Sequence, residues 1–193
     1  YPDRGEIERG FLKDRGLELV YVADAVEAFF IHVQGAARLT FDDGSQMRVT
    51  YAAKSGHPFT GPGRILIDSG EINPKTVSMQ SIRAWFKGNP ARTNDIIWQN
   101  RSFIFFEESP IGDRALGPVA AAKVQLTAGR SMAVDRLQHV FGSPFFCDAP
   151  NVNGGDKKPF RRTMIAQDTG SAIVGTARGD LFTGSGVAAG NIA

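Results

Sequence analysis

The sequence contains little of the chemistry that usually builds metal and redox sites. Its 193 residues include one cysteine, Cys147, and three histidines, His32, His57 and His139. A single thiol excludes an internal disulfide and any metal site made of several thiolates. The three histidines are far apart and show neither HxH nor HxxxH spacing, which neighbouring metal ligands would need. We therefore expect neither a metal ion nor any other cofactor.

A long apolar run and an excess of one charge are also lacking. No stretch reaches the roughly 18 apolar residues that a membrane-spanning helix needs. The 22 basic and 20 acidic residues give a net charge of +2, and the basic ones are scattered. This balance gives no electrostatic reason to expect a nucleic acid partner. The length allows one domain or two small ones.

What is present is a pattern of short apolar runs separated by Gly, Pro, Asp and Asn, which predicts a mainly β, barrel or sandwich architecture. The expected strands cover 17–23, 102–108, 129–135, 143–149, 161–168 and 178–184, with a hairpin of 29–41 and 46–53 around an Asp-Gly turn. A helix is expected over 78–86, with Ser78 as its N-cap, and a second helix from Pro90 towards Trp98.

Two aspartates, Asp168 and Asp180, stand near the ends of a segment rich in glycine and small residues, 166–182. Ordinary glycoside hydrolysis uses a pair of carboxylates, one as acid and one as base or nucleophile. Leu181 and Phe182 follow Asp180, so we expect a partly apolar environment that raises its pKa and suits a general acid. Asp168 precedes Thr169, where a turn would aim backbone amides at its carboxylate and keep it ionised. The alternative at either position is an aspartate that only caps a turn.

Longer motifs then point to one family. These motifs occur in the family's order: FFIHVQGAARLTFDDGSQMRVTYAAKSGHPFTGPGRILIDSGEI, SMQSIRAWFKGNP, QNRSFIFF, LTAGRSMAVD and AQDTGSAIVGTARGDLF. Together they resemble the membrane-bound lytic murein transglycosylase A family, whose members carry a three-aspartate (3D) domain. The resemblance extends from about Glu6 to Gly190.

The resemblance implies an all-β, mainly barrel fold: a double-psi β-barrel with a second, inserted β-barrel-like domain that carries short helices. It assigns 1–28 and 101–193 to the catalytic barrel and 29–100 to the insert, with a deep groove between the domains for the peptidoglycan strand. The sequence begins at Tyr1 and ends in GSGVAAGNIA. We therefore expect a fragment, with the barrel incomplete at both ends.

The resemblance also implies a site. Asp180 matches the single catalytic acid, and Asp168 and Asp135 match its supporting carboxylates. The expected substrate-binding residues are Gln34, Gly35, Tyr51, Lys54, Gln167 and Gly170. Family members cut the β-1,4 bond between N-acetylmuramic acid and N-acetylglucosamine without water, because the muramic C6 hydroxyl attacks C1 and closes a 1,6-anhydro ring.

The expected partner is thus a peptidoglycan glycan strand, and the expected state is a monomer. The family implies the Gram-negative periplasm, with a lipid anchor to the outer membrane attached upstream of Tyr1. The chain departs from the family's usual residues at Val174, where a lysine is common, and at Thr183. Two alternatives remain: a module that binds peptidoglycan without cutting it, and a hydrolase of another polysaccharide that uses Asp168 as its base.

Overall fold

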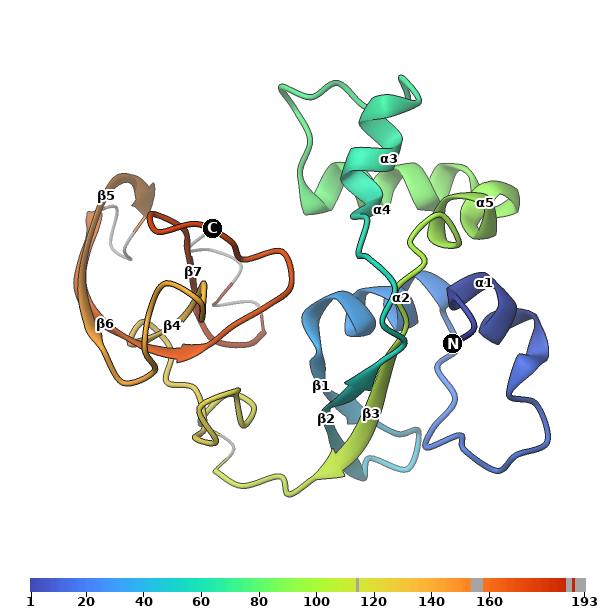
Figure 1. Ribbon diagram of the computed structural model, residues 1–193, viewed down its shortest axis with the longest axis horizontal. Helices are drawn as coiled ribbons and strands as arrows, with labels where there is room; N and C mark the ends of the chain where they lie inside the picture. Colours follow the sequence, from blue (N-terminus) through green and yellow to red (C-terminus); the bar gives the residue numbers. More distant parts are fainter. Residues whose placement is uncertain (114, 154–157, 187–188, 190–193) are drawn as a thin grey trace. The chain divides into compact units, whose positions relative to one another are not determined.

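A computed structural model describes residues 1–113, 115–153, 158–186 and 189. The chain forms two compact units, Tyr1–Glu108 and Ser109–Ala193, which we call the N-terminal and C-terminal units (Figure 1). Each unit is one continuous segment, so the chain passes between the units once.

The N-terminal unit combines helices with one sheet of three strands in the order β1-β2-β3. Its elements are α1 (Arg4–Glu6), the π-helical turn η1 (Ile7–Phe11), α2 (Ala25–Gln34), β1 (Ala36–Thr40), β2 (Gln46–Lys54), α3 (Pro62–Asp68), α4 (Met79–Gly88), the 3-10 turn η2 (Pro90–Arg92), α5 (Thr93–Ile97) and β3 (Ile104–Ser109).

The predicted hairpin is confirmed for β1 and β2, which pair antiparallel from Ala36 opposite Thr50 to Thr40 opposite Gln46. In the connecting loop Gly44 has φ +81°, and its N–H donates to the Phe41 carbonyl at 2.9 Å. A left-handed residue at this point is what closes a short hairpin loop, and glycine adopts it without steric cost.

Residues 29–34 were expected to begin the hairpin as a strand, and this prediction is wrong, because they form the second half of α2. The Asp24 carboxylate caps this helix by accepting from the N–H groups of Val26 (2.7 Å) and Glu27 (3.2 Å). Gly35, at φ +75°, ends it in the left-handed conformation. The apolar run suggested a strand, but the capping residues at both ends favour a helix.

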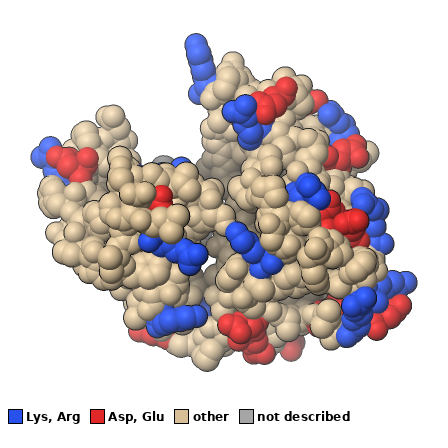
Figure 2. All heavy atoms as spheres, viewed as in Figure 1, with Lys and Arg blue, Asp and Glu red and all other residues tan. Residues whose placement is uncertain are grey.

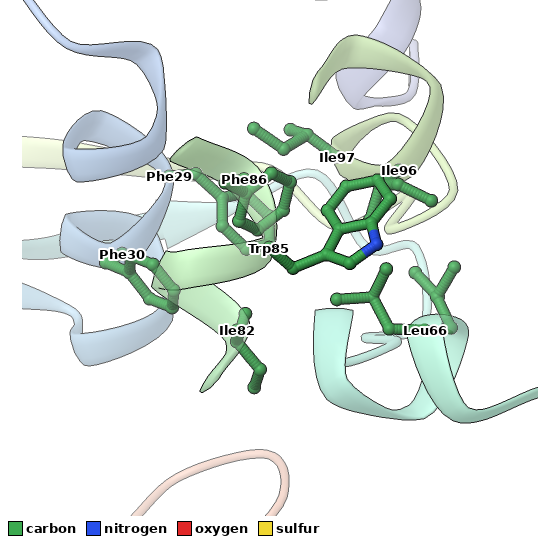
Figure 3. Close-up of a cluster of buried hydrophobic side chains, with 9 residues drawn as sticks. Phe29, Phe30, Leu66, Ile82, Trp85, Phe86, Ile96 and Ile97 are labelled. Carbon is green, nitrogen blue, oxygen red and sulfur yellow. The ribbon is translucent and has the colours of Figure 1, made fainter. Parts of the chain in front are cut away.

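The helices of the N-terminal unit enclose its core (Figure 3). As predicted, α4 begins after Ser78, whose hydroxyl accepts from the Ser81 N–H at 3.1 Å, and it buries Ile82, Trp85 and Phe86. The second predicted helix is confirmed as η2 and α5. The buried members of the core are Phe29, Phe30, Ile65, Leu66, Ile82, Trp85, Phe86, Ile96 and Ile97.

The start of the chain is fixed by a buried arginine. The guanidinium of Arg4, which is 1% exposed, donates to the Ser102 carbonyl through Nε (3.2 Å) and Nη2 (2.9 Å) and to Glu8 at 2.8 Å. It also lies over the Phe29 and Phe103 rings. The strand predicted at 17–23 is wrong, since these residues belong to no strand.

The C-terminal unit contains a four-stranded sheet in the order β5-β6-β4-β7. Its strands are β4 (Ser131–Val134), β5 (Pro144–Asn153), β6 (Pro159–Asp168) and β7 (Gly179–Leu181), so the expected strands at 129–135, 143–149, 161–168 and 178–184 are confirmed. Met164 and Ala166 are fully buried on β6 and pack with Met132, Val134 and Phe160. The ribbon shows this sheet curling strongly (Figure 1).

The expectation of a mainly β fold is confirmed, and the helices named above all lie in the N-terminal unit. No helix among the described residues is long and apolar enough to cross a membrane. On the face shown in Figure 2, basic and acidic side chains are interspersed.

Candidate functional site

The central strand of the C-terminal unit brings the three predicted aspartates together. Ala133 on β4 pairs with Asp168 on the parallel strand β6 and with Asp180 on the antiparallel strand β7. The two aspartates therefore flank one residue, and a strand spacing of about 4.8 Å puts their Cα atoms roughly 10 Å apart. Asp135 follows the end of β4 directly, two residues after Ala133.

The sheet register at this point is irregular, which alters the alternation of side chains. Met132 pairs with Ala166, yet the next residue, Ala133, pairs with Asp168, so that Gln167 is skipped. The Gln167 carbonyl instead accepts from the Ala122 N–H at 3.0 Å, and its side-chain oxygen accepts from the buried Ser131 hydroxyl at 2.5 Å. Such bulges are frequent next to functional sites because they redirect side chains.

Asp135 is held as a carboxylate by backbone amides. Its two oxygens accept from the N–H groups of Leu137 (2.9 Å) and Gly175 (2.8 Å). These hydrogen bonds, the one from Gly175 first, lower the pKa of Asp135 below its ordinary value. Only 9% of the residue is exposed. Asp135 therefore links the end of β4 to the segment that leads to β7.

Asp168 lies in a different environment from the one expected. Its carboxylate accepts from the Ala121 N–H at 3.2 Å and also from the Thr169 amide. Burial nevertheless raises the pKa of Asp168, and this effect exceeds the opposite effect of the two amides. The predicted backbone amides are therefore present, but burial outweighs their effect on the pKa of Asp168.

Asp180 is open to solvent and paired with a cation. Its carboxylate accepts from Arg178 through Nε at 2.6 Å and Nη2 at 3.2 Å, and both side chains are about half exposed. The carboxylate raises the pKa of the Arg178 guanidinium. This exposed, ion-paired carboxylate differs from the partly apolar environment that the sequence led us to expect.

Arg178 was not identified from the sequence. The signal was available, because residues i and i+2 of a strand share one face, and an arginine two positions from a candidate acid is a probable partner. The predicted substrate residue Gly170 lies in residues 169–178, the connection between β6 and β7. Its carbonyl accepts from the Ile173 N–H at 2.9 Å. Val174, the departure from the family, is 67% exposed there.

The connection before Asp180 is fastened by two side chains from the segment after β4. Besides the bond from Gly175 to Asp135, the imidazole of His139 donates from Nε2 to the Thr176 carbonyl at 2.9 Å. The Thr169 hydroxyl donates to the Val134 carbonyl at 2.8 Å. The aspartates and the connection between them thus form one hydrogen-bonded arrangement.

The other predicted substrate residues lie in the N-terminal unit. Gly35 and Tyr51 are adjacent, because the Tyr51 N–H donates to the Gly35 carbonyl at 2.8 Å. Gln34 is the last residue of α2, and Lys54 ends β2. The Tyr51 side chain is 48% exposed. These residues form a local group with one aromatic ring available for contact.

A pocket of about 450 Å³ opens in the C-terminal unit beside residues that adjoin Asp168. Its wall includes the predicted Gln167 and also Ala121, whose amide binds Asp168. No group of three or more His, Cys, Asp or Glu side chains that could hold a metal ion occurs in the described part of the chain.

Comparison with known families matches both units. The model of the MltA specific insert domain matches residues 1–107, and that of the 3D domain matches residues 130–193. The chain belongs to the MltA family. The resemblance recognised from the motifs is therefore confirmed.

Relatives and solved structures agree. The membrane-bound lytic murein transglycosylase A of Escherichia coli K12 is 34% identical over 196 residues, which cover 98% of this chain and 52% of that protein. A crystal structure of a membrane-bound lytic murein transglycosylase from Agrobacterium tumefaciens matches the whole chain with a TM-score of 0.93 and 55% identity. The chain covers 52% of that structure, so it spans about half the length of these relatives.

One solved relative carries a sugar. The structure of Escherichia coli MltA with bound chitohexaose matches the whole chain with a TM-score of 0.87 at 31% identity, and the chain covers 57% of it. The fold of this chain is therefore that of MltA.

Proposed function

We propose that this chain is part of a lytic transglycosylase that cleaves the β-1,4 bond between N-acetylmuramic acid and N-acetylglucosamine in peptidoglycan. The observation that carries the proposal is the pairing of Ala133 with both Asp168 and Asp180, with Asp135 at the end of the same strand. The type of reaction is inferred from membership of the MltA family, in which relatives bear the name lytic murein transglycosylase.

Asp180 is the proposed acid. It would protonate the glycosidic oxygen and then, as a carboxylate, accept the proton of the muramic C6 hydroxyl as that oxygen attacks C1. The 1,6-anhydro ring forms and the bond to the leaving sugar breaks. Asp180 gives up one proton and regains one, so it ends the cycle in its starting form. Because the nucleophile is tethered to the reacting ring, proximity replaces the water that a second carboxylate would activate.

The ion pair with Arg178 has to open during this cycle. A carboxylate bound through both oxygens to a guanidinium is the base form of the group, and its oxygens are occupied. Both side chains are about half exposed, so the pair is of the weakly stabilising surface type. An incoming glycan can therefore displace Arg178 at a small energetic cost.

Asp135 and Asp168 are proposed as supporting carboxylates. Asp135 fixes the connection to β7 through Gly175. Asp168 is partly buried beside β4, where it accepts from the Ala121 N–H, and burial raises its pKa. Hydrogen bonds and electrostatics, not proton transfer to substrate, are the roles that these environments favour.

Glycan contacts are proposed for Gln34, Gly35, Tyr51 and Lys54 of the N-terminal unit and for Gln167 and Gly170 of the C-terminal unit. The exposed Tyr51 ring supports this assignment, because aromatic side chains offer sugars an apolar face. The chitohexaose bound to Escherichia coli MltA shows that a relative of the same fold holds a β-1,4-linked glycan.

We extend the proposal to the protein's setting. In this proposal a double-psi barrel includes segments 1–28 and 101–193 of this chain, and residues 29–100 form the domain inserted into it. A monomer in the Gram-negative periplasm, anchored to the outer membrane, is the state that the family implies, and relatives bear the name membrane-bound.

One observation favours the alternative of a module that binds peptidoglycan without cutting it. The residue assigned as the acid is already engaged by Arg178, which donates to both of its carboxylate oxygens. In that case Asp180 would be a fixed anion with no proton to donate.

Digestion of purified murein sacculi separates these functions. We expect the protein to release fragments with 1,6-anhydro ends and Asp180→Asn to reduce the rate at least about 100-fold, as loss of a general acid does. Asp148→Asn is the matched control, since Asp148 is 47% exposed and paired with Arg161 in the same unit. Binding without cleavage by the unaltered protein would establish the alternative, and an active Asp180→Asn variant would remove the assignment of the acid.

A further inference from the structure

The pocket beside Asp168 has a lining that does not suit a bare sugar ring. Its described wall consists mainly of apolar side chains with one cation and one amide: Ala121, Ala122, Val124, Phe141, Lys123 and Gln167. The hydroxyl and N-acetyl groups at the edge of a sugar ring need several polar partners, and this wall offers only one cation and one amide side chain. A ligand with short apolar parts and one negative charge fits this lining better.

Lys123, the cationic residue of this wall, has an unusual backbone conformation. Lys123 has φ +62°, in the left-handed region, at the tip of a tight turn. Two hydrogen bonds close this turn: the Ala120 N–H donates to the Val124 carbonyl and the Lys123 N–H to the Ala120 carbonyl, both at 2.9 Å. A residue with a Cβ is disfavoured in this conformation, which glycine and asparagine adopt more readily. Backbone outliers of this kind are concentrated at functional sites.

The charge of Lys123 is available to a ligand. The residue is exposed, and its ammonium group forms no ion pair with any of the described residues. Its place on the pocket wall leaves it as the cation through which an anionic group would be bound.

The amide of Gln167 supplies a second polar contact. The Ser131 hydroxyl accepts from the Thr127 N–H at 2.8 Å and donates to the Gln167 side-chain oxygen at 2.5 Å. This fixes the oxygen and leaves the amide nitrogen as a donor for a ligand carbonyl or carboxylate. The adjacent residue, Asp168, ties the pocket to the proposed reaction centre through the Ala121 amide.

We infer that this pocket is a subsite for the peptide stem attached to the muramic acid of peptidoglycan, with Lys123 binding a stem carboxylate. The inference rests on the proposed function. Alanyl methyl groups of a stem suit Val124 and Phe141, and its carboxylates and carbonyls suit Lys123 and Gln167. Chitin-type chains lack such stems, so the subsite distinguishes peptidoglycan from other β-1,4 glycans.

The test compares glycan strands that carry tetrapeptide stems with the same strands stripped of stems by an amidase. We expect the protein to bind the stem-bearing strands more tightly in calorimetry. In Lys123→Gln the ratio of the two Kd values should fall about two- to fivefold, the effect of one exposed charge pair. Lys123→Arg should keep the ratio. Lys158→Gln, which removes an exposed lysine of the same unit outside the pocket wall, should also keep it.

A second measurement locates the contact. Titration of the labelled protein with a muramyl dipeptide should shift the backbone amide resonances of 121–124, Phe141 and Gly142. An unchanged Kd ratio in Lys123→Gln, an equal change in Lys158→Gln, or shifts confined to other residues would each overturn the subsite. Failure of the unaltered protein to bind either kind of strand would instead overturn the proposed function.

Discussion

His32 makes the N-terminal unit sensitive to acid. Its Nδ1 lies 3.3 Å from both the Arg4 guanidinium and the Ile104 N–H, and its ring lies against Phe103 and Phe106 with centroid distances of 4.6 and 5.2 Å. Burial, and then the charge of Arg4, lowers the pKa of His32 from 6.5 to about 3. Both neighbours donate to Nδ1, so the imidazole is bound in its neutral form.

The sign and size of the effect follow from proton linkage. Between pH 6.5 and pH 3 the unfolded chain protonates His32 and the folded chain does not, so stability is lost as the pH falls through this window. Each pH unit well below 6.5 costs about 1.4 kcal/mol, and because the unfolded chain is already half protonated at pH 6.5, the loss between pH 6.5 and pH 4.5 is about 2.3 kcal/mol. This is a large part of the 5–15 kcal/mol that typically separates a folded domain from its unfolded state.

His32→Asn isolates this contribution, because an asparagine oxygen can replace Nδ1 as the acceptor and does not titrate. The assay is urea unfolding followed by tryptophan fluorescence, and both tryptophans, Trp85 and Trp98, belong to the N-terminal unit. We expect the pH dependence of the unfolding free energy to be shallower in the variant by about 1.4 kcal/mol per pH unit between pH 4.5 and 6. Equal slopes in the two proteins would refute the reasoning.

Two further changes test local structure. Asp24→Ala removes the cap of α2 and should destabilise the N-terminal unit by about 1 kcal/mol in the same fluorescence assay. The control, Asp42→Ala in the hairpin loop, should have little effect. Similar losses in both variants would exclude a capping role for Asp24. Gly117→Ala would place a Cβ 2.5 Å from the Phe182 ring and should destabilise the C-terminal unit by about 1–3 kcal/mol, measured by hydrogen exchange of the β4 amides. Gly88→Ala, with open space around its Cβ, is the control, and unchanged exchange in Gly117→Ala would contradict the packing described.

The sequence predicted correctly those helices and turns that a few neighbouring residues specify. The loop around Gly44 and the N-cap Ser78 each specify a structure within a few residues, and both predictions are confirmed. α2 was mistaken because its apolar residues fit a strand, although Asp24 and Glu27 have the spacing of a helix start. α3, with Pro62 in its first turn, carried a similar signal that was overlooked.

The candidate site was predicted in its residues but not in its environments. The family motif indicates Asp135, Asp168 and Asp180, and the strand register brings all three to β4. The burial of Asp168 depends on tertiary contacts that no spacing reveals, whereas the i, i+2 spacing of Arg178 and Asp180 did indicate their pairing.

The most direct test of the proposed reaction is digestion of murein sacculi in water enriched in oxygen-18, with mass spectrometry of the released fragments. Because the muramic C6 oxygen is the proposed nucleophile, the new ends should be 1,6-anhydro rings without the heavy isotope. Reducing ends that contain oxygen-18 would show that water attacks the bond, and would contradict the transglycosylase mechanism built on Asp180.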